Sequence, residues 1–404
     1  MTSLVDVPDF PLPRDARCPF DPPPHADTVM REGRIERVRI WDGTTPWMIT
    51  RYDQVRQILT DPRTSADIRR PGFPDWSPSA VAATAQRRSF LNMDDPDHAQ
   101  QRRLLTVDFT IRRMEAMRPK VQAIVDRLID DMLAGPKPAD LVGAFALAVP
   151  SLVICELLGV PVADQAMFQR LGALTIAQDV SPQDAVAAHD TLLAYLIDLT
   201  RVKAENPGDD MLSRLAVEQL KPGGMTVEQI GKVGKLLLVA GHETTSNMIA
   251  LGTVALLQNP DQLAELRESG DPKLVAAAVE ELLRYLTVVH FGRRRIATED
   301  IEIGGVTIRA GEGIVIMLEN ANRDESEFAD PNRLDIHRDA RHHVGFGFGV
   351  HQCLGQPLAR VELQVVYQTL YRRIPTLRLA TPLEELPFKH DMNIYGVHEL
   401  PVSW

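Results

Sequence analysis

Residues 346–355 read Phe-Gly-Phe-Gly-Val-His-Gln-Cys-Leu-Gly, and the chain continues at 356–364 with Gln-Pro-Leu-Ala-Arg-Val-Glu-Leu-Gln. The first ten residues predict a tight loop, because glycine adopts the positive φ angles that other residues avoid. The nine that follow predict a helix, since their apolar side chains recur at helical spacing and Pro357 suits a first turn. Cys353 therefore lies just before a helix, where free backbone N–H groups and the helix dipole favour a thiolate over a thiol.

The sulfur of Cys353 has three possible roles at this point. A thiolate in a water-poor loop suits a haem iron, and thiolate ligation donates electron density that favours O–O cleavage. Cys353 could instead be a small buried apolar residue, as many lone cysteines are. It could also join His342, His343 and His351 around a non-haem metal ion.

The composition excludes several classes of protein. With 404 residues, 44% of them hydrophobic and 25% charged, the chain can build a large core. A formal charge of −11 argues against a general nucleic-acid binder or a binder of anionic membranes. Three scattered cysteines make no disulfide framework and suggest a reducing compartment. The Asp- and Pro-rich start is neither a signal peptide nor an anchor, and the apolar run at 141–155 is too short to span a bilayer. We therefore expect a cytoplasmic protein that binds neither nucleic acid nor membrane.

The N-terminal third combines an arm, a hairpin and a loop. Residues 1–24 predict a Pro-rich arm that is extended on the surface. Residues 35–50 alternate around Gly43, which indicates a β-hairpin, and a short helix should follow at 52–59. Residues 60–95 carry four prolines and little periodicity, and so long a loop in a compact protein is usually functional.

The rest of the chain is mostly helical. Helical patterns run from Pro96 to about residue 286, residues 295–318 resemble strands, and the C-terminus returns to short strands after the helix that follows Cys353. There is no internal repeat and no linker. The sequence therefore predicts a mostly α protein with small β-sheets, of the α+β class, in which residues 25–404 form a single domain.

A long buried helix is predicted from Thr226 to Asn259. Thr226 and Gln229 make a capping box, and Pro260 stops the helix after roughly 50 Å. The helix is apolar almost all round, which is typical of burial. Within it, Ala-Gly-His-Glu-Thr-Thr at 240–245 is unusual, because an acid and two hydroxyls follow small residues. A zinc-protease helix is excluded, since Ser246 stands where a second histidine is needed. An ordinary core threonine beside a glycine that permits close packing is the simpler alternative.

Two motifs together resemble one family. The pattern Phe346-x-x-Gly349-x-x-x-Cys353-x-Gly355 closely resembles the haem-binding loop of bacterial cytochromes P450. Residues 240–245 resemble that family's oxygen-activating groove. The resemblance covers essentially the whole chain and is strongest to the actinobacterial subfamily that hydroxylates drugs, secosteroids and polyketide-like compounds. It implies the cytochrome P450 fold, with the long central helix over a haem b whose iron Cys353 ligates.

The resemblance also implies roles for other residues. Glu243 and Thr244 would deliver protons to bound oxygen, beside the groove residues Ala240 and Gly241. Two carboxylates of haem need several cationic or N–H donors. The remaining implied positions are Phe346, Gly347 and Gly355 in the haem loop, His98, Arg102, Arg295 and His351 at the propionates, and a buried pair of Glu281 and Arg284 joined by Arg333.

The implied activity is that of a haem-thiolate monooxygenase. It would insert one oxygen atom from O₂ into a C–H bond of a bulky hydrophobic molecule that is macrolide-, statin- or secosteroid-like. No Rossmann fingerprint is present, so electrons from NAD(P)H would arrive through a ferredoxin and a ferredoxin reductase. Six cationic side chains between residues 98 and 120 could steer an acidic ferredoxin, or could form an ordinary solvated face. We expect a monomer.

The substrate and the competing activities are less defined. The expected lining is apolar and holds the substrate mainly by shape. Its predicted members are Leu91, Leu236, Leu237, Val288, Val289, Phe291 and Ile394. The alternatives are a peroxide-driven haem-thiolate peroxygenase and a non-catalytic haem-binding sensor. Peroxygenases of this family usually lack the acid–alcohol pair, which is intact at Glu243 and Thr244, and a sensor has no need of it.

Overall fold

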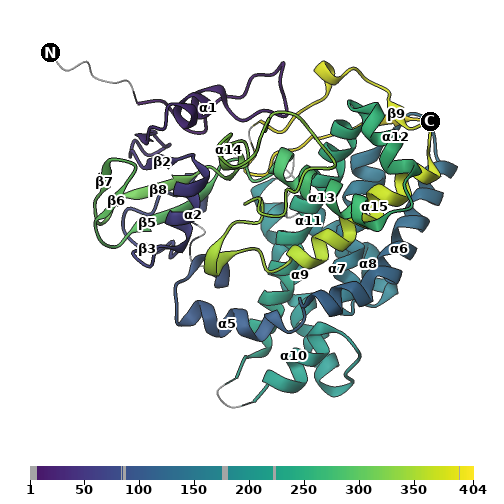
Figure 1. The fold of residues 1–404 in the computed structure, drawn as a ribbon. Coiled ribbons are helices and arrows are strands. Elements are labelled where there is room, and N and C mark those ends of the chain that lie inside the picture. The colour runs from purple at the N-terminus through teal and green to yellow at the C-terminus, as the bar shows by residue number, and fades with distance from the viewer. Residues whose placement is uncertain (1–6, 83, 85–87, 175–180, 222–223, 391) are drawn as a thin grey trace. The chain divides into compact units, whose positions relative to one another are not determined.

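The computed structural model describes residues 7–82, 84, 88–174, 181–221, 224–390 and 392–404 (Figure 1). The chain divides into two compact units, each assembled from separate stretches of sequence. Unit 1 comprises the described residues up to Thr110, with Ala255–Gln356 and Pro387–Gly396. Unit 2 comprises Ile111–Val254, Pro357–Leu386 and Val397–Trp404. The sequence predicted one domain over 25–404 and gave no signal for this division, because the stretches of the two units alternate along the chain.

Unit 1 is built on a five-stranded sheet. Its strand order is β1-β2-β8-β5-β3, with β2 parallel to β8 and the other pairs antiparallel. The strands are β1 (Glu36–Arg37), β2 (Trp47–Ile49), β8 (Gly313–Ile316), β5 (Arg293–Ala297) and β3 (Thr64–Ser65). The predicted hairpin at 35–50 is confirmed by the antiparallel pairing of β1 and β2. A second hairpin, β6 (Ile301–Ile303) and β7 (Val306–Ile308), turns at Gly304 and Gly305, which both have positive φ.

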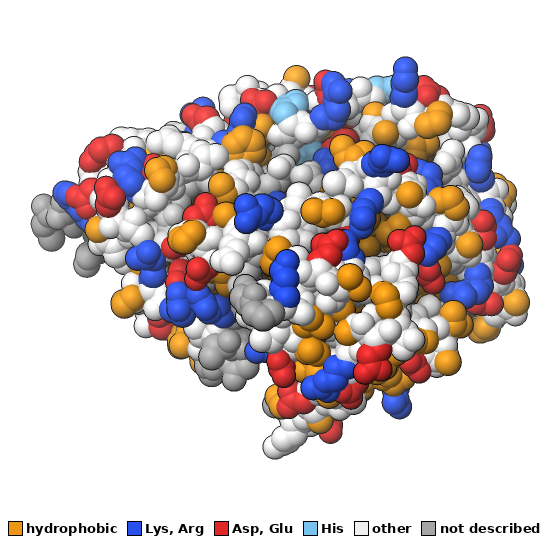
Figure 2. Space-filling view, turned by 90° about the horizontal axis from the view of Figure 1, so that it is seen from below, with side chains coloured by type: hydrophobic (Ala, Val, Ile, Leu, Met, Phe, Trp, Pro, Cys, Tyr) orange, Lys and Arg blue, Asp and Glu red, His pale blue; other side chains and the backbone are white. Residues whose placement is uncertain are grey.

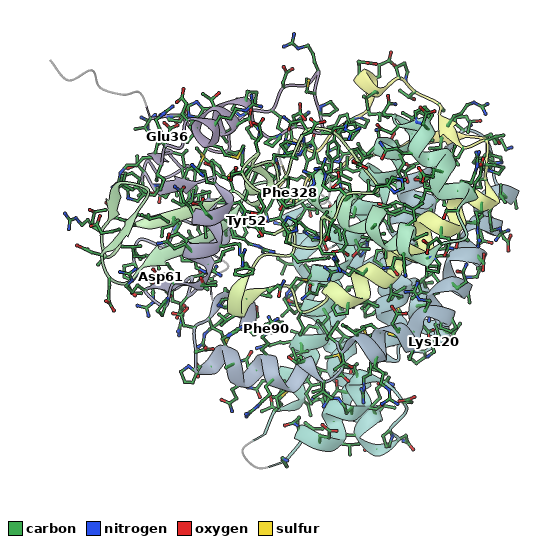
Figure 3. All side chains as sticks on the ribbon, in the orientation of Figure 1. Glu36, Tyr52, Asp61, Phe90, Lys120 and Phe328 are labelled. Atoms are coloured by element: carbon green, nitrogen blue, oxygen red, sulfur yellow. The ribbon has the colours of Figure 1, made fainter. Side chains whose placement is uncertain are left out.

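Unit 1 also contains helices, of which α2 (Tyr52–Thr60) packs against the sheet. The others are α1 (Pro24–Arg31), α3 (Pro78–Ala82), α5 (Asp97–Thr106), α12 (Pro260–Glu268), α13 (Pro272–Leu286), α14 (Leu318–Ala321) and the short turns η1 (Phe90–Asn92) and η3 (Gly349–His351). Helix α2 confirms the helix expected at 52–59. Its Tyr52 ring meets the Phe328 ring edge-on with centroids 5.9 Å apart (Figure 3). These rings belong to a buried cluster with isoleucines of β6, β7 and β8, so α2 is held on the sheet by apolar packing.

The N-terminal arm is not only a surface feature. Phe10 and Leu12 are 9% and 6% exposed, and both join a buried cluster that includes Met48 and Phe291. The expectation that the whole arm lies on the surface is therefore wrong, because its apolar side chains alternate inward between exposed prolines. Residues 1–6 of the predicted arm lie outside the described residues.

Unit 2 is a bundle of helices with one small sheet (Figure 1). Its helices are α6 (Ile111–Ala134), η2 (Val142–Ala146), α7 (Ala148–Leu158), α8 (Val162–Leu174), α9 (Pro182–Glu205), α10 (Met211–Gln219), α11 (Val227–Leu257), α15 (Gln356–Arg373) and η4 (Leu383–Glu385). The sheet has the order β4-β10-β9, from Ala139–Asp140, Pro401–Ser403 and Arg378–Leu379. Helix α6 packs against α7, and α9 packs against both α8 and α10. Helix α7 ends at Gly159, which has a φ of 68° in the left-handed region that suits glycine.

Helix α11 is the long helix that the sequence predicts. The Thr226 N–H donates to Gln229 Oε1 at 2.7 Å, and the Gln229 N–H donates to Thr226 Oγ1 at 3.2 Å, so the capping box is confirmed. The helix ends at Leu257, two residues before the predicted end. Ile249, Leu251, Val254 and Leu256 are fully buried, as expected. Although α11 is long, none of the described helices is both long enough and apolar enough to cross a membrane.

Helices α11 and α15 approach closely at Gly252. The Tyr367 hydroxyl of α15 donates to the Met248 carbonyl at 2.5 Å. A Cβ at Gly252 would overlap this hydroxyl.

We expect Gly252→Ala to lower stability by about 1–3 kcal/mol, because the overlap costs more than the helix propensity of alanine returns. The measurement is the melting temperature. Gly234→Ala in the same helix is the control, since its Cβ would meet Leu196 at an ordinary 3.5 Å. Equal melting temperatures for the two variants would contradict this packing.

Candidate functional site

The loop that carries Cys353 has the predicted backbone. Gly347 and Gly349 both have a φ of 73°, in the left-handed region that favours glycine. At Gly349 a Cβ would also lie 2.6 Å from the Leu59 carbonyl oxygen. The Cys353 N–H donates to the Phe346 carbonyl at 2.8 Å, which closes the loop directly before α15. Cys353 itself is half-buried. The positive-φ glycines and the closing hydrogen bond thus define the backbone that carries its sulfur.

The charge state of Cys353 differs from the prediction. Burial raises the pKa of the thiol, and this effect exceeds the opposing influence of Arg293, the Gly355 N–H and Arg102. The backbone N–H groups at the helix terminus lower the pKa of the thiol, as expected, but desolvation of the charged sulfur outweighs them. A coordinated metal ion reverses this balance, because a thiol bound to a metal is deprotonated.

Four predicted anion-binding residues meet in unit 1. The His98 and His351 ring centroids are 4.1 Å apart. Arg102 on α5 donates to the Gln352 carbonyl at 2.6 Å, next to His351. Arg295 on β5 is 7% exposed, and its charge contributes to the lowered pKa of His351. The structure thus brings together side chains that are up to 253 positions apart in the sequence.

Burial shapes the protonation of this cluster. Burial, Arg295, His98 and Arg102 lower the pKa of His351 to about 3, so the ring is neutral at pH 7. Burial and Arg293 lower the pKa of Arg295 to about 10, so its guanidinium stays charged. His351 therefore serves as an N–H donor, and the arginines supply the positive charge.

Asp95 is the carboxylate that pairs with this cluster, through His98. His98 Nδ1 bonds Asp95 at 2.9 Å, but its buried Nε2 has no partner. Within the described part of the chain, no carboxylate forms an ion pair with Arg102, Arg293 or Arg295. The buried Arg295 and the orphaned ring nitrogen would be stabilised most by an anionic ligand, and the half-buried Arg102 and the exposed Arg293 would add positive charge beside it. The chemistry of this donor set fits a ligand with two carboxylates.

Arg293 belongs to this cluster, although sequence reasoning did not select it. Side chains alternate along β5, so Arg293 and Arg295 share one face while Arg294 occupies the other and lies 4.8 Å from the Trp76 ring centre. Arg293 is also the largest charge effect on Cys353. In a strand, residues 293 and 295 point to the same side, so the choice of Arg295 from the sequence could have led to Arg293 as well.

Glu281 and Arg284 form the predicted buried pair. Arg284 Nε and Nη2 donate to the two Glu281 oxygens at 2.7 and 2.8 Å, and both side chains are 0% exposed. Arg284 Nη1 also donates to the Asn322 and Pro331 carbonyls at 2.7 and 2.9 Å. This fork-to-fork geometry satisfies both charges inside the protein.

The second arginine that bonds Glu281 is Arg338, whereas the resemblance implied Arg333. Arg338 Nε donates to Glu281 Oε1 at 3.2 Å. The Arg333 side chain is 66% exposed and pairs with Asp330 and Asp335. The prediction for Arg333 is wrong because this loop turns its carbonyls inward, and only the Arg333 carbonyl faces Arg284, at 3.5 Å.

In unit 2, the acid–alcohol pair that the resemblance implies lies on α11. Thr244 Oγ1 donates to the Ala240 carbonyl at 2.8 Å. Ala240 is exposed and Thr244 is half-buried, whereas Glu243 is 8% exposed. Asn247, which sequence reasoning missed, donates to the Glu243 carboxylate at 3.1 Å. Leu236, Ala240 and Thr244 recur every four residues, so they form one accessible stripe on the helix.

The predicted lining residues separate into two groups. Val289 and Ile394 form a β-bridge, and Val288 is 7% exposed beside them. Phe291 instead belongs to the buried cluster with Phe10, so the structure places it in the core and corrects that prediction. Leu91 is 46% exposed, and Leu236 and Leu237 are on α11. Residues 83, 85–87 and 175–180, within other stretches expected to line the substrate, lie outside the described residues.

The non-haem interpretation does not fit the geometry. His342 stacks on Phe328 with ring centroids 4.6 Å apart and pairs with Glu327. His343 lies 3.4 Å from Glu280, away from His351. Among the described residues, no three side chains of the His, Cys, Asp or Glu type are placed to hold a metal ion together.

Comparisons with known proteins show the family to which the chain belongs. The family model for cytochrome P450 matches residues 183–374. The chain is 54% identical over 401 residues to Cytochrome P450 GfsF of Streptomyces halstedii, which covers 99% of this chain and 97% of that one. It is 44% identical over 401 residues to the vitamin D3 dihydroxylase of Streptomyces griseolus, covering 99% and 98%.

Solved structures give the same result for the fold. The crystal structure of GfsF matches with a TM-score of 0.94 at 54% identity and covers 98% of this chain and 100% of that one. The mycinamicin VIII C21 methyl hydroxylase MycCI of Micromonospora griseorubida, bound to mycinamicin VIII, matches with a TM-score of 0.89 at 39% identity, covering 98% and 100%. The predicted mostly α fold with small sheets is confirmed. The chain therefore belongs to the cytochrome P450 family, as a monooxygenase that binds haem b and receives electrons from NAD(P)H through redox partners.

Proposed function

We propose that this chain inserts one oxygen atom from O₂ into a C–H bond of a bulky hydrophobic small molecule that is macrolide-, statin- or secosteroid-like. The observation that carries the proposal is the stripe on α11, where the Thr244 hydroxyl is accessible beside the buried Glu243. When bound, haem supplies an iron that activates dioxygen for this insertion.

The residues that would hold the haem are those of the loop and the cationic cluster. Cys353 would ligate the iron from the loop shaped by Phe346, Gly347 and Gly355. Arg102 and Arg295, with Arg293 in addition, would neutralise the propionates, and His98 Nε2 and His351 would donate N–H groups to them. An anion beside His351 also favours its charged form, so haem binding should raise the low pKa of this ring.

Proton delivery is the role we assign to Glu243 and Thr244. Productive oxygen activation needs protons at the outer oxygen, and an ordered hydroxyl or water must hold them within hydrogen-bond reach. The Thr244 hydroxyl is held by the Ala240 carbonyl at 2.8 Å, and Asn247 orients the Glu243 carboxylate at 3.1 Å. Both side chains are thus fixed by bonds within one helix.

Replacing Thr244 tests this role. Thr244→Ala should leave haem binding nearly intact, because alanine keeps the helix propensity and most of the packing. NAD(P)H oxidation should become uncoupled, with hydrogen peroxide replacing most of the hydroxylated product. The measurement compares cofactor oxidised, peroxide released and product formed in the same assay.

Two variants control this experiment. Thr244→Ser keeps the hydroxyl and should restore coupling. Thr253→Ala removes another hydroxyl of α11, which bonds the Ile249 carbonyl at 2.8 Å in the core, and should not change coupling. If Thr244→Ala stays coupled, Thr244 is a packing residue, and if it loses haem its role is structural.

The redox partners are part of the proposal. We propose a ferredoxin and its reductase, and turnover with a surrogate pair separates this function from a haem sensor or a peroxide-driven peroxygenase. The basic segment expected to steer the ferredoxin is partly neutralised, since Arg118 pairs with Glu115 at 2.8 Å and Lys120 with Glu156 at 3.2 Å. The face in Figure 2 likewise mixes Lys and Arg with Asp and Glu. Steering by this segment should therefore be modest.

The substrate class is supported by the lining and by relatives. Val288, Val289 and Ile394 are apolar, and Leu236 adds an apolar residue to the accessible stripe. Names of relatives refer to a secosteroid, vitamin D3, and to a macrolide, mycinamicin VIII. Substrate-induced shifts of the Soret band across macrolides, statin-like lactones and secosteroids would identify the class.

We also propose a cytoplasmic monomer, which size-exclusion chromatography and cell fractionation can test.

A further inference from the structure

A buried arginine of the N-terminal arm connects segments of unit 1 that are far apart in sequence. The Arg14 side chain is 3% exposed. Its Nη2 donates to Glu319 of α14, which is 4% exposed, and its Nη1 donates to the Asp21 carbonyl at 2.5 Å. Its Nε donates to His290 Nδ1 at 3.3 Å, and its guanidinium lies 4.1 Å from the Tyr395 ring centre. A planar guanidinium suits this set of contacts, because it bonds in its plane and stacks on its face.

His290 and Tyr395 belong to the two segments that carry the proposed lining. The Tyr395 N–H donates to the Val288 carbonyl at 2.7 Å, and Val289 bridges Ile394. His290 Nε2 donates to the Met392 carbonyl at 2.5 Å, and this fixes the tautomer whose Nδ1 accepts from Arg14. Segments 288–291 and 392–395 are therefore bonded to each other, and Arg14 contacts one side chain on each.

The arm itself is anchored on both sides of Arg14. Before it, the Phe10 N–H donates to the Arg39 carbonyl at 2.7 Å, and Phe10 contacts Phe291 with ring centroids 6.3 Å apart. After it, the Phe20 carbonyl accepts from Arg323 at 2.9 Å. Arg14 is thus held at a defined place and is not a side chain on a loose tail.

We propose that Arg14 is a positioning residue for substrate selectivity, which sets the spacing of Val289 and Ile394 by holding His290 and Tyr395 together. The inference rests on the proposed function, in which these residues line the substrate. A substrate held mainly by shape is sensitive to this spacing, because misplacement by about 1 Å can change reactivity by about a hundredfold. No charge of Arg14 needs to reach the substrate.

The partner of Arg14 decides which variants are informative. Burial raises the pKa of Glu319 to about 7, and Arg14 opposes this rise. Removing only the arginine would leave a buried carboxyl without its partner and could unfold the region. Arg14→Met combined with Glu319→Gln removes both charges, so it releases His290 and Tyr395 without that penalty. Arg14→Lys keeps a charge for Glu319 but loses the planar fork.

The experiment uses the haem-loaded protein and ligands that bind without turnover. Imidazole serves as the small ligand, and 4-phenylimidazole and clotrimazole serve as bulky ones whose aryl groups a nearby lining would contact. In both Arg14 variants we expect the Kd of imidazole to stay within about twofold and that of a bulky azole to change about tenfold or more. Hydrogen exchange at the Tyr395 N–H should also accelerate, because its bond to Val288 is no longer held by the clamp. Arg17→Met is the matched control, since Arg17 is three residues away on the same arm and its side chain is 88% exposed.

Each outcome decides the proposal. Equal changes for small and bulky azoles, or no change for either, would overturn it. Failure of both variants to retain haem would also overturn it, because Arg14 would then be only structural. If the bulky azoles respond but no substrate is oxygenated, the positioning role stands and the proposed function fails.

Discussion

Cys353→Ser is expected to abolish the red-shifted Soret band of the CO-bound ferrous protein and to reduce oxygenation to background. Serine is close to cysteine in size, and the bond from residue 353 to the Phe346 carbonyl uses the backbone, so the loop should keep its shape. What changes is the donor, because a hydroxyl cannot supply the electron density of a thiolate. The measurement is the difference spectrum of the reduced protein with and without CO.

Cys18→Ser is the control for this variant. Cys18 is exposed, so its replacement removes a thiol without touching the core, and the band should persist. Cys155 is unsuitable, since it is fully buried in α7 and a hydroxyl there would lack a partner. Persistence of the band in Cys353→Ser would refute Cys353 as the iron ligand.

Glu281→Ala and Arg284→Ala should each destabilise the protein by about 3–5 kcal/mol, because each leaves a buried charge without its partner. Three bonds of Arg284 join α13 to the loop at 322–333 through backbone carbonyls, and two more hold Glu281 within α13. We therefore expect a lower melting temperature and loss of haem during gel filtration. Arg338 would remain near Glu281 in the Arg284 variant and should make it the milder of the two.

Glu115→Ala provides a matched control, because the Glu115–Arg118 pair has the same three-residue spacing and two bonds of 2.8 Å. Its side chains are 48% and 35% exposed, so its removal should cost only about 0–1 kcal/mol. If the Glu281 and Arg284 variants melt within the range of this control and keep their haem, the buried pair does not support the fold.

Local patterns were predictable because their causes are local. The glycines of the loop, the capping box at Thr226 and the spacing of Glu281 and Arg284 each follow from neighbours within one turn or one helix face. Arg333 was misjudged because spacing does not reveal which side chain of a loop turns inward. Asp330, with a φ of 48°, lies in the turn that brings Arg338 to Glu281 instead.

Other features depend on contacts between distant stretches. The thiol state of Cys353 depends on how much protein surrounds it, which no local pattern encodes. Arg14 contacts residues up to 381 positions away in the sequence. The Pro-rich composition of the arm gives no pattern from which the burial of Phe10 and Leu12 could be predicted. The division into two units also depends on contacts between distant stretches, because the stretches of the two units alternate along the chain.

The orphaned His98 nitrogen and its unpaired arginines tie the abundance of this protein to haem supply. These donors come together only in the folded chain, so a ligand that they hold binds that state and stabilises it. By mass action, haem at about a thousandfold over its Kd adds about 4 kcal/mol to stability. A cell short of haem would therefore accumulate less of this protein, and its level would follow porphyrin synthesis as well as transcription.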